Sequence, residues 1–261
     1  MNLNLKGKNA LVCGSSKGIG KAAAFELAQL GANVTLVART GEKLAAVKQE
    51  LPRVAGQNHD FLVADFGNIA DLQKKVSGLV ALKPIHILVN NTGGPGASPL
   101  MDASLDDFKQ AFQKHVICNH VLTRLTLKGM KASKYGRIIN IISTSVKEPL
   151  NGLGVSNTIR NAVANWAKTL SNEIGQTGIT VNNVLPGFTQ TERLTELIQH
   201  NAEASGMSEE TIMKAMQAEV PLGRFADPKE IAAAIAFLAS PAASYITGTN
   251  LVVDGGRTKS L

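Results

Sequence analysis

The fold of this chain follows from the stretch Ala10-Leu11-Val12-Cys13-Gly14-Ser15-Ser16-Lys17-Gly18-Ile19-Gly20. Its four apolar residues predict a buried strand, and the alanine-rich sequence beyond it predicts a helix. The glycines between them let the backbone turn tightly and approach a ligand closely. Backbone N–H groups at the start of a helix bind anions, so the loop is predicted to hold the pyrophosphate of a dinucleotide.

The same alternation of strand and helix continues along the chain. Strands are predicted near residues 9–14, 33–38, 60–64, 86–90, 137–142, 179–184 and 249–253. Helices are predicted at 18–30, 42–50, 69–81, 104–130, 155–175 and 227–239. The strand Ile138-Ile139-Asn140-Ile141-Ile142 is apolar on both faces, as a parallel sheet covered by helices requires. We therefore expect a single Rossmann-type α/β domain over residues 1–261, with a doubly wound, parallel, seven-stranded sheet and helices on both faces.

One region departs from this alternation of strands and helices. Residues 189–220 are polar and helical in pattern and contain no predicted strand. They follow the carboxyl end of a strand, which is where ligands bind in open α/β sheets. We expect a helical lid over a substrate cleft here, and the alternative is an ordinary surface excursion.

Composition narrows the class of protein. Of the 261 residues 44% are hydrophobic and 18% charged, which is typical of a compact globular enzyme. No apolar run reaches the roughly 20 residues that span a bilayer, and residues 1–6 lack the apolar core of a signal peptide. Cys13 and Cys118 lie in apolar segments without metal-ligand spacing, so we expect reduced, buried thiols, no metal and a cytoplasmic protein.

The net charge of +7 is ambiguous by itself. Nucleic acid is not expected as a partner, because aromatic residues make up only 4% and no arginine-rich run occurs. The charge fits a basic soluble protein, and also an acidic small partner such as a phosphorylated cofactor or an acyl carrier.

Several further motifs resemble the short-chain dehydrogenase/reductase family over essentially the whole chain. They are the glycine loop, Asp65, Asn90-Asn91-Thr92-Gly93, Pro186-Gly187-Phe188-Thr189-Gln190-Thr191, and a tail from Pro221-Leu222-Gly223-Arg224-Phe225 to Asp254-Gly255-Gly256 that is most similar to β-ketoacyl carrier-protein reductases. Thr92 stands where the family usually has alanine. The resemblance implies cofactor contacts from Gly14, Ser16, Lys17, Gly18, Ile19, Gly20, Arg39, Asp65, Phe66, Asn91, Gly93, Arg160, Pro186, Gly187, Thr189 and Thr191.

Charge at the end of the second predicted strand indicates which cofactor is used. An NAD enzyme usually has a carboxylate there to bind the ribose 2′-hydroxyl. This chain reads Leu36-Val37-Ala38-Arg39-Thr40, without an acid. Arg39 and Lys17 offer two cations to a 2′-phosphate, so we expect NADP(H) in preference to NAD(H).

The catalytic set that the resemblance implies is altered. The family uses an asparagine, a serine that polarises the carbonyl, a tyrosine that donates the proton, and a lysine that lowers the tyrosine pKa and holds the ribose. Ser143 matches the serine, but the tyrosine, lysine and asparagine positions carry Ser156, Arg160 and His115. We take these four residues as the catalytic candidates.

Neither tyrosine of the chain is expected to substitute. Tyr135 precedes a strand at the sheet end opposite the cleft, and Tyr245 lies in a segment expected at a subunit contact. A Ser156 hydroxyl stops roughly 4 Å short of a tyrosine hydroxyl, so a water would have to bridge the gap. Arg160 could hold the ribose and supply fixed charge, but it does not release protons near neutrality. His115 could titrate directly, or it could be a buried core histidine.

Two functions follow from this sequence. The first is an NADP(H)-dependent carbonyl reductase or alcohol dehydrogenase with an altered mechanism, acting on a small carbonyl or alcohol, including a 3-oxoacyl thioester. The second is a catalytically inactive NADP(H)-binding sensor or regulator. The cluster Lys128, Lys131, Lys134 and Arg137 could receive an acidic carrier protein, or it could be a solvated helix end.

The family resemblance also implies an oligomer, with a homotetramer expected ahead of a dimer. An apolar face on the helix predicted at 155–175, made by Val163, Trp166, Ala167 and Leu170, could belong to the core or to such an interface.

Overall fold

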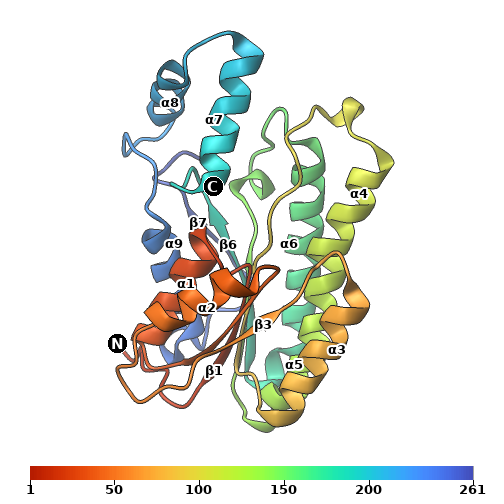
Figure 1. Ribbon diagram of the computed structural model, residues 1–261, viewed down its shortest axis with the longest axis vertical. Helices are drawn as coiled ribbons and strands as arrows, with labels where there is room; N and C mark the ends of the chain where they lie inside the picture. The colour runs from red at the N-terminus through yellow and green to blue at the C-terminus, as the bar shows by residue number, and fades with distance from the viewer. Residues whose placement is uncertain (261) are drawn as a thin grey trace.

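Seven parallel strands form one sheet at the centre of the computed structural model, which describes residues 1–260 (Figure 1). The strand order is β3-β2-β1-β4-β5-β6-β7, so the chain begins in the middle and winds outward in both directions. The strands are β1 (Asn9–Cys13), β2 (Asn33–Ala38), β3 (Asp60–Val63), β4 (Ile87–Asn90), β5 (Gly136–Ile141), β6 (Ile179–Pro186) and β7 (Asn250–Val253). The predicted doubly wound, seven-stranded α/β fold is confirmed.

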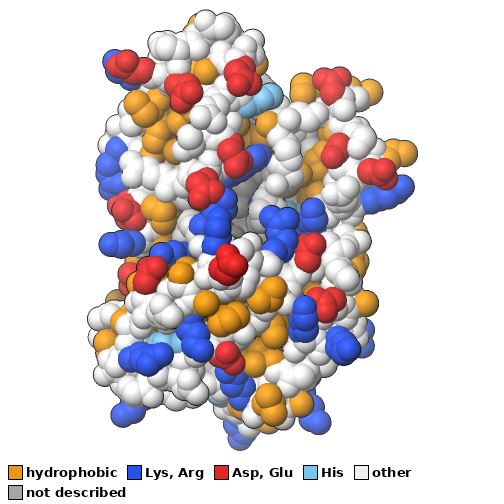
Figure 2. Space-filling view, in the orientation of Figure 1, with side chains coloured by type: hydrophobic (Ala, Val, Ile, Leu, Met, Phe, Trp, Pro, Cys, Tyr) orange, Lys and Arg blue, Asp and Glu red, His pale blue; other side chains and the backbone are white. Residues whose placement is uncertain are grey.

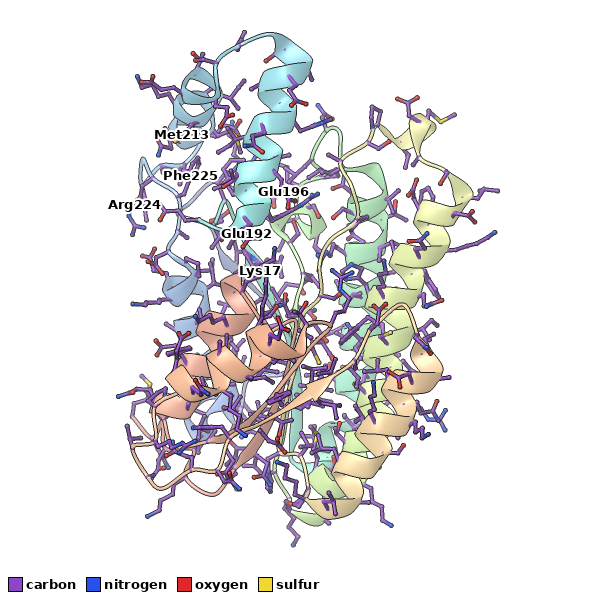
Figure 3. The ribbon with its side chains drawn as sticks, viewed as in Figure 1. Lys17, Glu192, Glu196, Met213, Arg224 and Phe225 are labelled. Atoms are coloured by element: carbon purple, nitrogen blue, oxygen red, sulfur yellow. The ribbon has the colours of Figure 1, made fainter. Side chains whose placement is uncertain are left out.

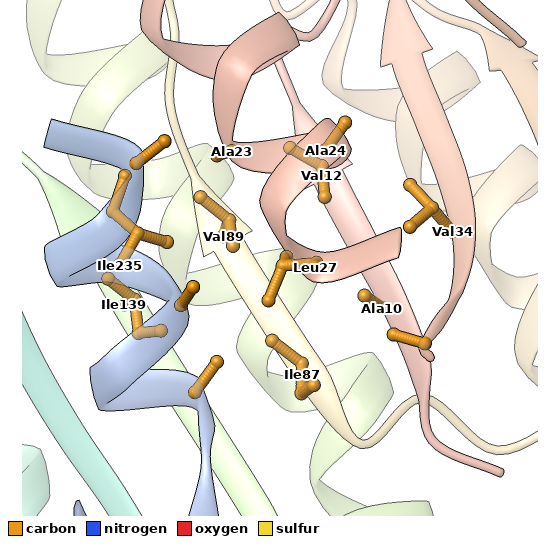
Figure 4. Close-up of a cluster of buried hydrophobic side chains, with 14 of the residues drawn as sticks. Ala10, Val12, Ala23, Ala24, Leu27, Val34, Ile87, Val89, Ile139 and Ile235 are labelled. Carbon is orange, nitrogen blue, oxygen red and sulfur yellow. The ribbon is translucent and has the colours of Figure 1, made fainter. Parts of the chain in front are cut away.

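Helices cover both faces of the sheet. One face carries α1 (Gly18–Gln29), α2 (Gly41–Glu50) and α9 (Pro228–Ala239), and the other carries α3 (Ile69–Leu82), α5 (Cys118–Ala132) and α6 (Gly154–Ile174) (Figure 1). Because successive side chains of a strand point to opposite faces, each strand contributes to two cores. Ala10 and Val12 pack toward α1 and α9, as Figure 4 shows, while Leu11 and Cys13 belong to the core on the opposite face.

Local signals in the sequence determine where several helices begin. α9 starts at Pro228, directly after Asp227, whose carboxylate accepts a hydrogen bond from the backbone N–H of Lys229 at 2.8 Å. α4 (Leu105–Phe112) starts with a capping box between Ser104 and Asp107. Such caps satisfy N–H groups that have no partner within the helix.

The helix predicted as one piece over 104–130 is interrupted. A π-helical turn, Gln113–Ile117, separates α4 from α5. Helical residues run through the predicted range without a gap, and the prediction did not include the π turn, which inserts one residue into the helical repeat. The turn carries His115, one of the catalytic candidates.

A ladder of asparagine side chains crosses four strands. Asn90, Asn140, Asn183 and Asn250 are aligned in register on β4, β5, β6 and β7. Each side-chain N–H donates to the next side-chain carbonyl, at 2.8, 2.8 and 2.7 Å in that order. The ladder gives buried amide groups the hydrogen bonds that burial demands.

The region 189–220 is helical, as predicted, and forms α7 (Glu192–Ser205) and α8 (Glu209–Ala218). These two helices project beyond the sheet at the top of Figure 1. They share a small apolar core made by Leu194, Ile198, Met216 and Phe225. The remaining short elements are 3-10 turns at Leu100–Asp102, Thr144–Val146, Gly175–Thr177 and Pro241–Ala243. Among residues 1–260 no helix is long and apolar enough to cross a membrane.

Candidate active site

A cavity of about 480 Å³ opens at the carboxyl ends of the central strands. Residues that directly follow four strands line it: Gly14 after β1, Asn91 after β4, Ile142 after β5 and Gly187 after β6. The N-terminal part of α7 forms the opposite wall, through Thr191, Glu192, Arg193, Leu194, Glu196 and Leu197. Figure 2 shows a hollow near the centre of this face with basic side chains on both sides. Open α/β sheets bind their ligands at this position.

The glycine loop is held in place by Asn91. The Asn91 side chain donates to the carbonyls of Cys13 and Gly14, at 3.3 and 3.2 Å. Gly14 has φ +58°, and a Cβ there would lie 2.7 Å from the carbonyl oxygen of Asn91. A Cβ on Gly20 would lie 2.2 Å from the carbonyl oxygen of Gly14. Both positions therefore require glycine, Gly14 for its conformation and Gly20 for close packing.

The start of α1 fits a dinucleotide pyrophosphate. No side chain caps this helix end and no acidic residue lies in its first turn, so its N–H groups are open to an anion. Gly18 and Ile19 in the same loop line the cavity. The residues present thus match the group that the sequence motif predicts.

A second cavity, of about 360 Å³, continues from the first and shares with it Gly14, Lys17, Arg39, Thr92, Gly93 and Gly94. Ser16, Asp65 and Phe66, three of the predicted cofactor contacts, line it. Its basic side chains are Lys17, Arg39, Lys43 and Lys114, against the single acid Asp65. Sequence reasoning missed Lys43, four residues beyond Arg39 in the first turn of α2, and Lys114, next to His115.

Lys17 forms an ion pair with Glu192, the first residue of α7. Figure 3 shows these two side chains pointing toward one another, from the glycine loop and from α7. Both side chains are more than half exposed. The nearby lysine lowers the pKa of the Glu192 carboxyl, mainly through their hydrogen bond. The ion pair thus connects the phosphate-binding loop to the helix on the opposite wall.

Ser143 and Ser156 line the same cavity, near its inner end. Ser143 lies two residues beyond β5, and its hydroxyl oxygen accepts a hydrogen bond from the backbone N–H of Ser145 at 3.1 Å. This acceptor role leaves the Ser143 hydroxyl hydrogen available for a ligand. Ser156 lies in the first turn of α6.

Arg160 is one turn further along α6 and is buried, with 9% of its surface exposed. Its Nη1 donates to the carbonyl of Ile141 at 2.8 Å, and its Nε has no partner within the described chain. Burial lowers the pKa of Arg160 to about 10, and the positive charge of Arg193 adds to this effect. Arg160 therefore remains protonated at neutral pH, as a cation with unused N–H groups beside the cavity.

His115 does not line either cavity. It is buried, and this burial lowers its pKa well below 6.5, with a further contribution from the charge of Arg160. A hydrogen bond to the backbone of Gly93 opposes this shift but does not cancel it. The ring is therefore neutral and tied to the loop that follows β4, which favours a supporting role over direct proton transfer.

Most of the predicted site residues come together in these two cavities, and the exceptions are Gly20 and His115. Neither Tyr135 nor Tyr245 lines them, as expected. The Tyr135 hydroxyl donates to the carbonyl of Ala239 at 2.6 Å, and Tyr245 is fully exposed. Arg193 and Arg257 line the first cavity but were not singled out from the sequence, because nothing in the polar pattern of 189–220 or the tail distinguishes them.

The predicted basic cluster includes one residue that is not on the surface. Lys128, Lys131 and Lys134 are exposed, but Arg137 is 3% exposed. Its guanidinium donates to the carbonyls of Gly136 and Ser240 and stacks on the ring of Tyr135, at 4.2 Å from the ring centroid. The Arg137 part of the carrier-protein prediction is therefore wrong, because backbone carbonyls and an aromatic ring use this cation internally.

Two other expectations concern the apolar face of the helix predicted at 155–175 and the two cysteines. Val163 and Ala167 belong to the core, while Trp166 and Leu170 are partly buried against it. Cys13 and Cys118 are buried free thiols. Within residues 1–260 no group of three or more His, Cys, Asp or Glu side chains is placed to hold a metal ion.

Comparison with known proteins adds to this geometry. A family model described as enoyl-(acyl carrier protein) reductase matches residues 14–258. The 3-oxoacyl-[acyl-carrier-protein] reductase FabG of Vibrio harveyi is 34% identical over 260 residues, covering 97% of this chain and 98% of the relative. The L-sorbose reductase of Gluconobacter frateurii, solved with NADPH and L-sorbose, has a TM-score of 0.93 and 29% identity over the whole of both chains. YwfH, an NADPH-dependent reductase involved in bacilysin biosynthesis, has a TM-score of 0.91 and 27% identity, covering 97% of this chain and 99% of that one.

The doubly wound sheet, the glycine loop and the cavity at the strand ends together define a dinucleotide-binding α/β oxidoreductase. The chain belongs to the short-chain dehydrogenase/reductase family. It is an enzyme that uses a nicotinamide dinucleotide, and 3-oxoacyl carrier-protein reductases and polyketide ketoreductases are among its relatives. The alternative of an inactive sensor finds no support among these relatives.

Proposed function

We propose that this protein is an NADP(H)-dependent carbonyl reductase, working also as an alcohol dehydrogenase in reverse, in which a water relay replaces the usual tyrosine. The observation that carries the proposal is the joint presence of Ser143, Ser156 and Arg160 along one wall of the cavity, beside the nicotinamide-binding segment Pro186–Thr191. Bound NADPH would supply a hydride to the carbonyl carbon of the substrate and leave as NADP⁺.

The chain's own residues would polarise the carbonyl and deliver one proton to its oxygen. The free hydroxyl hydrogen of Ser143 would donate to that oxygen. Ser156, too short to reach it, would hold a water that gives a proton to that oxygen and takes one from bulk solvent in its place. The fixed charge of Arg160 would stabilise the developing alkoxide and hold the ribose, without giving up a proton. His115 would support the Gly93 loop from behind.

The relay predicts a measurable loss on Ser156→Ala. A positioned general acid contributes about 10²–10⁴-fold in rate, and we expect this substitution to lower single-turnover NADPH oxidation at least tenfold. The NADPH dissociation constant should stay within about threefold of the parent, since Ser156 is not part of the phosphate-binding loop. Oxidation would be followed at high protein concentration against β-ketoacyl thioesters, quinones and small ketones.

Two further variants complete this experiment. Ser143→Ala should remove the oxidation altogether, whereas Ser133→Ala, at the exposed end of α5 and away from the cavity, should leave it unchanged. Unchanged turnover in Ser156→Ala would disprove the relay. No oxidation by the parent protein, with NADPH demonstrably bound, would disprove the reductase proposal as a whole.

The preference for NADP(H) rests on the basic side chains of the second cavity. Arg39 directly follows β2, where an NAD enzyme has an acid, and Lys17 and Lys43 line the same cavity. We expect Arg39→Gln to weaken NADPH binding at least tenfold while changing NADH binding less than threefold. Arg53→Gln, at an exposed arginine outside both cavities, is the matched control. Equal losses for both cofactors would contradict the preference.

Three wider expectations belong to the same proposal. The α7–α8 segment would serve as a lid, since the N-terminal part of α7 forms one wall of the cavity. The protein would assemble as a homotetramer, using exposed parts of α4, α5 and α6. Two buried free thiols support a cytoplasmic location.

A further inference from the structure

Besides Arg39, three arginines line the first cavity, and they differ in which acidic side chain neutralises them. Arg193 pairs with Glu196 at 3.3 Å and donates to the carbonyl of Pro95 at 2.9 Å. Arg257 pairs with Glu219 at 2.7 Å. Arg160 is the most buried of the three, and no carboxylate of residues 1–260 forms an ion pair with it or raises its pKa.

The acids of the cavity wall are already engaged. Glu192 pairs with Lys17, and Glu196 pairs with Arg193. Neither is placed to neutralise Arg160. Buried charges in proteins are nearly always paired, because an unpaired charge in a poorly solvated site is costly. The missing anion must therefore come from a ligand.

Arg160 also has the donors to bind such an anion. A guanidinium carries five N–H groups, and only one of them donates within the described chain, to Ile141. The Nε has no partner but is enclosed by the protein, and Nη2 lies against Gly94, 3.4 Å from where a Cβ of that residue would be. Arg160 lines the first cavity, so the N–H groups of its two terminal nitrogens are the ones available to a ligand there. Two parallel N–H groups on one edge match the two oxygens of a carboxylate.

The position of Arg160 limits the distance between that carboxylate and the reacting carbonyl. The guanidinium donates to the carbonyl of Ile141, and Ser143, which would polarise the substrate, is two residues further along the same chain. The phosphates of the cofactor have their own sites at the glycine loop and at Arg39. An anion at Arg160 would therefore belong to the substrate and lie close to its carbonyl carbon, because Ser143 and Arg160 line the same cavity.

We propose that the substrate is a short oxo acid, or the corresponding hydroxy acid, whose free carboxylate is bound by Arg160. This inference rests on the proposed reductase function and names its substrate class. It favours a free 2-oxo or 3-oxo acid over a thioester or an ester of the same acid, because the latter two lack the negative charge.

A binding experiment on the protein saturated with NADPH tests this without requiring turnover. The probes are unreactive acids and their neutral amides, namely oxamate with oxamide and malonate with malonamide, titrated by calorimetry. At least one acid should bind tenfold more tightly than its matched amide. In Arg160→Lys this preference should fall at least tenfold, because an ammonium cannot present two parallel N–H groups. Arg124→Lys, on the exposed side of α5, is the matched control and should behave as the parent.

A second measurement separates the binding site from the reaction. Single-turnover NADPH oxidation by acetoacetate is compared with oxidation by its methyl ester, and acetoacetate should react at least tenfold faster. Acids and amides that bind equally, or no binding by either acid, would overturn the proposal. The proposal would also be overturned by an Arg160→Lys variant that loses NADPH affinity and still prefers the acid over the amide. Arg160 would then bind the ribose alone. Arg160→Gln, whose thermal unfolding is measured beside it, guards against a variant that fails to fold.

Failure of the reductase function would have a different signature. If acids bind in preference to amides and no carbonyl compound oxidises NADPH, the proposed carboxylate site is supported and the proposed reductase function is disproved. If neutral ketones or thioesters oxidise NADPH and acids neither bind nor react, the proposed reductase function is supported and the proposed carboxylate site is disproved.

Discussion

At the scale of single residues, burial decides the protonation of the histidines. His59 and His86 each accept a backbone N–H at Nδ1, from Val34 at 3.1 Å and from Asn9 at 2.9 Å. A protonated ring cannot accept these bonds. Desolvation is the largest cause that lowers the pKa of both histidines, and of His115, below 6.5.

These shifts predict a loss of stability in mild acid. Below pH 6.5 the histidines of the unfolded chain take up protons while those of the folded chain do not, so the unfolded state binds more protons and stability falls with falling pH. The contribution of His115 has a slope of at most about 1.4 kcal/mol per pH unit. Urea unfolding at pH 7.5 and pH 5.5 would show a lower midpoint at pH 5.5. His115→Asn should reduce the difference and His200→Asn, on the exposed side of α7, should not. A midpoint independent of pH would contradict this account.

The identities of the site residues were the easiest part of the site to predict. Ser143, Ser156 and Arg160 were found by counting along the chain with the residue spacing of the family that the sequence resembles. Their surroundings were not predictable in the same way. Within residues 1–260 Arg160 lacks an acid partner while Arg257 pairs with Glu219, and this difference depends on contacts between elements distant in sequence. Arg137 was misplaced for the same reason, since its partners lie on three different segments.

At the scale of elements, the asparagine ladder sets the order and register of four strands. Apolar strands alone can slide by two residues and still bury their side chains. The bonds from Asn90 to Asn250 form in one register only. The sequence predicted each strand to within about two residues. It contained no sign of the ladder, because neighbouring members of the ladder are separated by 50, 43 and 67 residues.

The ladder predicts a large effect of Asn140→Leu. Asn140 is fully buried, and its loss leaves the side-chain N–H of Asn90 and the side-chain carbonyl of Asn183 without their ladder partner. An unsatisfied buried group costs about 1–3 kcal/mol, so the free energy of unfolding should fall by about 2–5 kcal/mol in urea titrations. Asn172→Leu, on the exposed face of α6, is the control and should change it by less than about 0.5 kcal/mol. A loss below 1 kcal/mol for Asn140→Leu would mean that the ladder contributes little.

At the scale of the whole molecule, the two walls of the cavity are joined by charged and polar contacts. Lys17 of the glycine loop pairs with Glu192 of α7, and Arg193 of α7 donates to the loop after β4. The α7–α8 segment has its own apolar core, so it can keep its structure while its distance to the sheet changes. The sequence indicated the position of this segment but not its attachments.

The Lys17–Glu192 ion pair predicts that removing the acid strengthens cofactor binding. A 2′-phosphate would compete with Glu192 for Lys17, and exposed pairs are worth about 0.2–1 kcal/mol. Glu192→Gln should therefore lower the NADPH dissociation constant up to about fivefold, with little change for NADH. Glu210→Gln breaks a comparable exposed pair with Lys214 on α8 and is the control. Fluorescence titration measures the NADPH dissociation constants of both variants. Weaker NADPH binding in Glu192→Gln would contradict the prediction.

The same ion pair has a consequence for the order of events in turnover. A phosphorylated cofactor that binds Lys17 displaces Glu192 from it, so entry of the cofactor would also loosen the first turn of α7. A substrate that arrives before the cofactor would find α7 still held to the glycine loop by the Lys17–Glu192 ion pair. The protein would accordingly follow a compulsory order, in which the nucleotide is the first reactant to enter and the last product to leave.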